Sequence, residues 1–217
     1  DMRRKLYGNE NAEVAESMNN LALVLRSESR LAEAEKLHRE ALVMDLKLFG
    51  HDHLAVATSL NNLALTLDAE GNPADAESCF RESLGIQKKL LGDDQPGLAI
   101  TLDNLAFVLR EEGRLDEAET LERQSLAMQQ KIFGPEYPSV ATAINDLGLI
   151  LAAQGKTIEA EKLLREALAQ RRKLLGPEHP ELAASLHDLA ALLREEKQLG
   201  EAGRLEGEAL AMRKNLY

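Results

Sequence analysis

Three rows of side chains that could hold a ligand recur along this chain at intervals of 42 residues. The first row is mainly asparagine, whose side-chain amide both donates and accepts hydrogen bonds. It consists of Asn19, Asn61, Asp103, Asn145 and His187, with Asn62 beside it. A row of amides suits the backbone of an extended peptide. The alternative is that these amides bond to neighbouring helices, which would compensate for the modest helix propensity of asparagine.

The other two rows carry apolar and positively charged groups. Four residues after each member of the first row the side chain is apolar, and the candidates for the floor under an aromatic or aliphatic anchor are Leu23, Leu65, Phe107 and Leu149. Packing between adjacent helices is the alternative role for them. Three residues further on come Arg26, Arg110 and Arg194. Arginine pairs with carboxylates in a bidentate manner, although these three could also simply lie near helix C-termini.

Other kinds of chemistry find little support in the sequence. His51 and His53 have no third metal ligand nearby in the sequence. Cys79 falls at a core position, where a thiol acts as a small apolar group. There is no nucleophile with a plausible base and no phosphate-binding glycine loop. We therefore expect no enzymatic activity, no cofactor and no metal site.

Charge and hydropathy narrow the partners. The formal net charge of −11 argues against nucleic acid, which requires a basic surface, and against anionic membranes. No apolar run approaches the roughly 18 residues of a membrane span, and no signal peptide opens the chain. One cysteine excludes an internal disulfide. A cytoplasmic setting is the expectation.

The elements that position the three rows follow from the repeat. Its frame is a glycine that returns every 42 residues, at Gly8, Gly50, Gly92, Gly134 and Gly176. Counting from each glycine as position 0, positions 10, 13, 14 and 17 are apolar, and so are positions 26, 29 and 34 with few exceptions. Steps of three and four place each set on one helical face. Each repeat is therefore predicted to be two amphipathic helices, and the first row above is position 11.

Turn signals agree with this division. Pro96, Pro138 and Pro180 lie at position 4, where a proline in the first turn of a helix loses no hydrogen bond. Gly71, Gly113 and Gly155 are expected to form left-handed turns between the two helices. The corresponding residues of the outer repeats are Ser29 and Lys197.

The repeat also defines the domain organisation. We expect one solenoid over residues 1–217, in which each unit buries its apolar face against its neighbours. Its repeats are 8–49, 50–91, 92–133, 134–175 and 176–217. Residues 1–7 match the end of a preceding repeat, so we expect a partial helix there. No polar capping segment is visible at either end, which allows self-association through the uncapped ends.

The repeat resembles the tetratricopeptide repeat, and its 42-residue length is similar to the kinesin light chain subtype. The resemblance rests on the pattern LxxLAxxL, then Gly, then EAE and AL, and on segments such as SLNNLA at 59–64 and LGPEHP at 175–180. It implies an all-α, right-handed α-solenoid of five helix-turn-helix units, with the first helices lining a concave groove. It does not imply a kinesin partner, because the heptad coiled coil of the light chains is absent from this sequence.

The resemblance also guides the functional hypotheses. Chaperone-binding members of the family carry Asn at position 15 and a basic residue at position 11, and neither is found here. In the light chains, cargo peptides combine an aromatic residue with flanking acids, which an apolar floor beside arginine would suit. We therefore expect a non-catalytic scaffold that binds an extended protein or peptide segment in the groove. The alternative is a structural, oligomerisation or sensor arm of a larger signalling protein.

Overall fold

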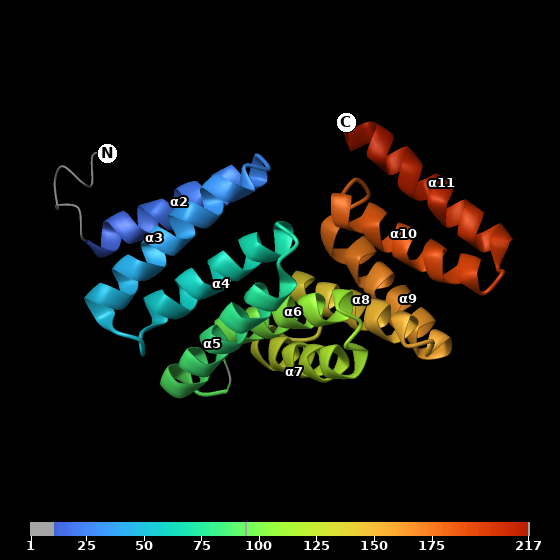
Figure 1. Ribbon diagram of the computed structural model, residues 1–217. Coiled ribbons are helices and arrows are strands. Elements are labelled where there is room, and N and C mark those ends of the chain that lie inside the picture. The colour runs from blue at the N-terminus through green and yellow to red at the C-terminus, as the bar shows by residue number, and fades with distance from the viewer. Residues whose placement is uncertain (1–10, 94, 217) are drawn as a thin grey trace. The chain divides into compact units, whose positions relative to one another are not determined.

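Helix-turn-helix pairs make up the whole described part of the protein, which in this computed structural model comprises residues 11–93 and 95–216 (Figure 1). The first helices of the five pairs are α2 (Ala12–Ser27), α4 (Leu54–Ala69), α6 (Pro96–Glu111), α8 (Pro138–Ala153) and α10 (Pro180–Glu195). The second helices are α3 (Leu31–Phe49), α5 (Pro73–Leu91), α7 (Leu115–Phe133), α9 (Thr157–Leu175) and α11 (Leu199–Leu216). The partial helix predicted for residues 1–7 lies outside the described residues.

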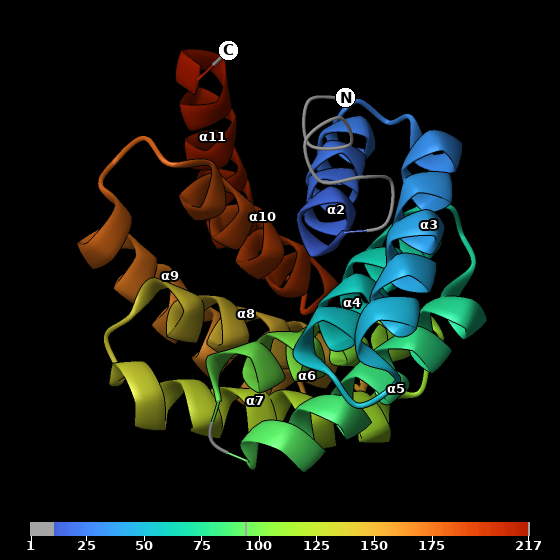
Figure 2. The same ribbon diagram turned by 90° about the vertical axis from the view of Figure 1, so that its left-hand side faces the viewer.

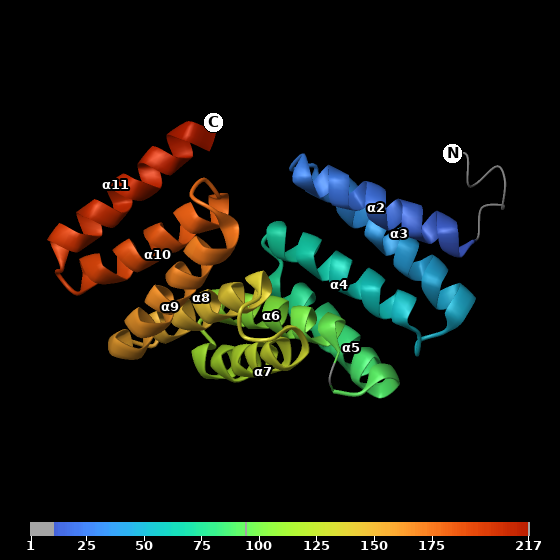
Figure 3. The same ribbon diagram turned by 180° about the vertical axis from the view of Figure 1, so that it is seen from behind.

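The chain divides into two compact units, Asp1–Glu112 with α2 to α6 and Gly113–Tyr217 with α7 to α11. In the first unit each helix packs against the next one along the chain, and α4 also contacts the two first helices α2 and α6 (Figure 2). In the second unit α7 to α11 follow the same sequential order, and α8 contacts α10 (Figure 3). This stepwise packing of helix pairs confirms the predicted all-α solenoid class.

The turn between the two helices of a repeat and the turn between successive repeats have different backbone conformations. Gly71, Gly113 and Gly155 have φ of 82°, 77° and 77°, and Ser29 and Lys197 adopt the same positive φ at 61° and 63°. The left-handed turn predicted between the two helices is therefore confirmed. Residues with side chains adopt this conformation at a modest cost, so these turns tolerate serine and lysine.

The framing glycines are under a stricter constraint. Gly50 has φ 74° and ψ −177°, and Gly134 has φ 84° and ψ 165°. This region of backbone space is essentially restricted to glycine. Gly92 and Gly176 share this conformation, which explains why glycine stands at these four positions, whereas the turn inside the repeat varies.

Small residues at the helix crossings are buried throughout. The alanines at position 7 and those at position 26 are all at most 6% exposed, and they are Ala15, Ala57, Ala99, Ala141 and Ala183, then Ala34, Ala76, Ala118, Ala160 and Ala202. Leucine at position 13 is likewise buried at Leu63, Leu105, Leu147 and Leu189. Leu21 differs, with 51% exposed, because no described helix precedes α2 to cover that face.

Candidate functional site

A buried chain of hydrogen bonds links three helices of the first unit. His38 on α3 lies 2.8 Å from the Oδ1 of Asn19 on α2. The Asn19 amide donates to Ser59 Oγ on α4 at 2.8 Å, and the Ser59 hydroxyl donates to Asp45 Oδ2 on α3 at 2.6 Å. Because a carbonyl oxygen only accepts, the histidine proton resides on Nδ1. The bonds therefore run in one direction, from His38 to Asp45.

Burial controls the protonation of both ends of this chain. It lowers the pKa of His38 to about 4, with a smaller contribution from the positive charge of Arg26. Burial also raises the pKa of Asp45, while the Ser59 hydrogen bond and nearby His53 act in the opposite direction. His38 is therefore neutral at pH 7, which agrees with a single proton on Nδ1.

A pocket of about 240 Å³ opens beside the buried chain, between α2 and α4. Its lining includes Asn19, Asn20, Asp45, Phe49, Thr58 and Asn62. Asn19 and Asp45 are buried, whereas the other four are partly or largely exposed, so these two form the floor and the others form the rim. Phe49 is held by stacking on His53, with ring centroids 4.2 Å apart. His53 is fixed in turn, because its Nδ1 accepts the backbone N–H of Ala55 and caps α4.

Further along the first unit, predicted residues of α4 and α6 lie next to one another. Asn104 donates to Asn61 across the two helices at 3.5 Å. Phe107, in the apolar row, is 46% exposed. The Arg110 guanidinium lies 4.9 Å from the centre of its ring and pairs with Glu111 at 2.9 Å. Amide, aromatic and guanidinium groups thus share one region of the first-helix surface.

The remaining predicted residues of the first unit are less distinctive. Leu23, Arg26, Leu65 and Asp103 are all half-buried. Asp68, at the arginine-row position of α4, has a raised pKa because of burial and the nearby charge of Glu111. A carboxylate at this position reduces the positive charge that the row was predicted to carry.

In the second unit, Asn145 takes part in a similar buried network. It is 3% exposed, donates to Asp188 at 2.9 Å, and accepts from Ser185 at 3.1 Å. Ser185 in turn accepts from Arg171. Asn19, at 7% exposed, and Asn145 therefore bond to neighbouring helices, the alternative that the sequence left open for this row.

The other predicted residues of the second unit occupy three different surroundings. Leu149 packs at the margin of the core around Leu147 and Leu186. His187 is half-buried and lies 2.9 Å from Glu206. Arg194 is exposed. These predicted residues of the second unit therefore lie in separate surroundings and do not form one group.

One set of polar residues was missed from the sequence. Position 37, on the second helix, carries Asp45, Gln87, Gln129 and Arg171, all at most 8% exposed. Gln87 donates to Ser83 and Thr101, and Arg171 donates to Ser185. The signal was present in the spacing, because position 37 continues the buried stripe of positions 26, 30, 33 and 34 and is nevertheless polar in each repeat.

Cys79, for which the sequence predicted a core position and no catalytic role, lies against apolar side chains. Cys79 is half-buried and packs against the cluster around Val56 and Ile86, and burial raises the pKa of its thiol. Among the described residues, no helix is both long enough and apolar enough to cross a membrane.

The chain is similar in sequence and fold to known repeat proteins. The tetratricopeptide repeat family matches residues 13–89, 69–131, 97–169 and 139–215. Curated protein sequences give no match. Among solved structures, the "kinesin light chain nearly identical TPR-like repeats" of Podosopora anserina are 27% identical, with a TM-score of 0.78, over 95% of this chain and 98% of that chain.

Two further structures share the fold at lower identity. BtubC (BKLC) from P. vanneervenii is 23% identical, with a TM-score of 0.81, over 94% of this chain and 82% of that one. A Rap protein complexed with competence and sporulation factor is 15% identical, with a TM-score of 0.73, over 90% of this chain and 53% of the Rap chain.

Proposed function

Because the chain belongs to the tetratricopeptide repeat family, as its 42-residue repeats predicted, we propose that its first-helix surface binds an extended segment of a protein partner. Proteins of this family generally act as non-enzymatic interaction scaffolds. The same fold in the Rap structure occurs in a complex with competence and sporulation factor. The proposed role requires no catalytic group and no cofactor.

The observation that carries the proposal is the exposed aromatic group on α6. Nearly half of Phe107 is exposed, although its equivalents on α4 and α8, Leu65 and Leu149, are half-buried. A large apolar side chain exposed beside polar groups is a typical anchor for a partner. In this proposal a partner side chain packs on Phe107.

Arg110 would supply the polar part of the same contact. Its present partner Glu111 is mostly exposed, and such pairs contribute about 0–1 kcal/mol. A carboxylate of the partner could replace Glu111 without a large penalty. The paired amides of Asn61 and Asn104 would hold the partner backbone nearby. The preferred ligand is therefore a segment that combines an aromatic residue with acidic ones.

The test is a random-peptide display selection on the whole chain with Phe107→Ala and Arg110→Glu variants in parallel. We expect an enriched aromatic–acidic motif that both variants lose. Phe133→Ala is the matched control, because Phe133 is a similarly exposed aromatic residue that stacks on Tyr137. Enrichment that is equal on all four proteins would exclude this surface.

Self-association is a second candidate, favoured by apolar side chains on the outermost described helices. Leu21 and Val24 are exposed on α2, and Leu210, whose equivalents Leu84 and Leu168 are buried, is 54% exposed on α11. The α11 helix of one copy could pack on α2 of another copy, in the way that α3 packs on α4 and α9 packs on α10. Sedimentation should then detect an assembly of several copies, and Leu21→Glu should abolish it. A monomer at high concentration would refute it.

A further inference from the structure

We infer that the pocket between α2 and α4 holds one cationic side chain, arginine or lysine, of the bound partner. This inference rests on the proposed function, since the side chain belongs to the segment that lies on the first helices. It adds a basic residue to the aromatic–acidic segment and predicts where along the chain that residue binds.

The Asp45 carboxylate lies at the floor of the pocket with one oxygen already bonded. Asp45 is only 4% exposed, and Ser59 holds its Oδ2 at 2.6 Å. Its other oxygen makes no hydrogen bond among the described residues, and Asp45 lines the pocket. This oxygen is not one of the described side-chain atoms that are fully buried and unpartnered, so it is accessible from the pocket. A positively charged N–H group that enters the pocket would form a charge-assisted hydrogen bond with it.

The remaining lining of the pocket also suits a cationic side chain in its charge and shape. Lysine and arginine are absent from the nine described residues that line the pocket. The stacked ring of Phe49 offers a face on which an aliphatic stem or a guanidinium can rest. The volume of about 240 Å³ is below the roughly 300–1,000 Å³ of sites for whole small molecules, which favours a single side chain.

Other repeats carry different side chains at the position of Asp45. Gln87 donates its amide to Ser83 and Thr101, and Arg171 donates to Ser185 and Thr142. These donor groups are engaged within the protein, and the side-chain oxygen of Gln87 is a neutral, buried acceptor without a partner. Asp45 differs because its acceptor is a carboxylate that lines a pocket. A basic residue of the partner therefore favours the first junction between repeats.

The experiment is a display selection of random dodecapeptides on the whole chain and on two variants. Asp45→Asn keeps an oxygen to accept the Ser59 bond and removes the charge, and circular dichroism would verify its fold. Asp75→Asn is the matched control, since Asp75 is an exposed carboxylate on α5. We expect arginine or lysine at one fixed position among the enriched peptides, and at least a tenfold weaker binding of those peptides to Asp45→Asn only. Enriched peptides without a fixed basic residue, or with one that persists on Asp45→Asn, would overturn the inference and leave the proposed function standing.

A second measurement separates the two proposals if no peptide is enriched. N-acetyl-arginine amide is titrated into the isotope-labelled chain, with N-acetyl-citrulline amide as its uncharged counterpart. Shifts at the side-chain amides of Asn20 and Asn62 that arginine causes and citrulline does not would uphold the pocket while the proposed function fails. Equal shifts, or none up to tens of millimolar, would refute the pocket as well.

Discussion

The imidazole Nδ1 of His38 lies 2.8 Å from the side-chain oxygen of Asn19, with both groups buried. This contact orients the asparagine amide so that its nitrogen faces Ser59 on the next repeat. Asn19, which the sequence suggested as a ligand-binding residue, therefore forms hydrogen bonds that connect two successive repeats.

Removal of that amide should weaken the first unit. Asn19→Ala leaves His38 without its acceptor and Ser59 without its donor. We expect the free energy of unfolding to fall by about 1–3 kcal/mol, measured by urea denaturation. Asn20→Ala on the exposed side of α2 should change it by less than about 0.5 kcal/mol. Similar effects of the two substitutions would mean that the buried bonds contribute nothing.

Acid should destabilise the first unit through His38. Its pKa is about 4 in the folded protein, against 6.5 for the unperturbed group. The unfolded chain therefore binds the proton first, and stability decreases as the pH falls from 6.5 towards 4. At about 1.4 kcal/mol per pKa unit, reduced for relaxation of the surroundings, the loss is on the order of 2 kcal/mol. Urea denaturation of His38→Gln, which keeps a donor for Asn19 and does not titrate, should lack this part of the pH dependence.

Substitutions in the turns between helices should change the stability of the protein in opposite directions. Lys197→Gly should stabilise the protein by about 0.5–1 kcal/mol, because it relieves a positive φ at a smaller cost in chain entropy. Gly155→Ala, in an equivalent turn with φ 77°, should destabilise by about 1 kcal/mol. Gly134→Ala should cost more, about 2 kcal/mol, since its backbone region is nearly closed to other residues. Equal thermal shifts for the two glycine variants would contradict this order.

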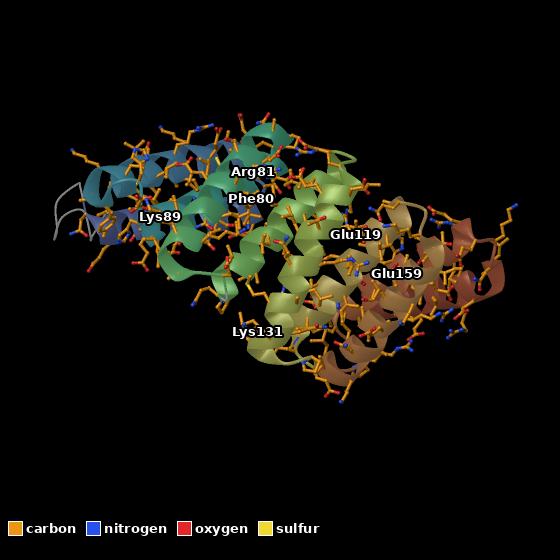
Figure 4. All side chains as sticks on the ribbon, turned by 90° about the horizontal axis from the view of Figure 1, so that it is seen from below. Phe80, Arg81, Lys89, Glu119, Lys131 and Glu159 are labelled. Atoms are coloured by element: carbon orange, nitrogen blue, oxygen red, sulfur yellow. The ribbon has the colours of Figure 1, made fainter. Side chains whose placement is uncertain are left out.

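Ion pairs between successive second helices should add a small, acid-sensitive contribution. Glu119 on α7 accepts from Lys156 at 2.7 Å and from Arg123 at 2.9 Å, and Arg123 also reaches Glu159 on α9. Figure 4 shows Glu119 and Glu159 on these two successive second helices. Hydrogen bonding, first from Lys156, lowers the pKa of Glu119 to about 2. The contribution is therefore present above pH 4.5 and is lost as the pH falls towards 2.

The measurement for this prediction is thermal unfolding of Glu119→Gln. Because the two basic partners Arg123 and Lys156 are nearly half exposed, the loss at pH 7 should be below about 1 kcal/mol. It should shrink in high salt and at low pH. A loss that is independent of both would point to packing rather than charge.

Local patterns in the sequence predicted the helix pairs, their turns and the alanine crossings correctly. Each depends on the character of single residues and on spacing within one helix, such as the glycine at 134 or the proline at 138. The role of Asn19 could not be predicted in this way, because it depends on His38 and Ser59, which lie 19 and 40 residues away in the chain. The exposure of Leu21 depends similarly on whether another helix covers it.

By itself, the sequence determined the repeat, its family and the class of surface available for a partner. Only the tertiary structure decided which side chains remain exposed. Asn19 and Asn145 are buried and bond to neighbouring helices, Phe107 is exposed, and Asp45, which the sequence did not single out, lines a pocket. The physical reason is that periodicity defines the face of a helix, whereas burial and hydrogen bonding depend on what the neighbouring helices place against that face.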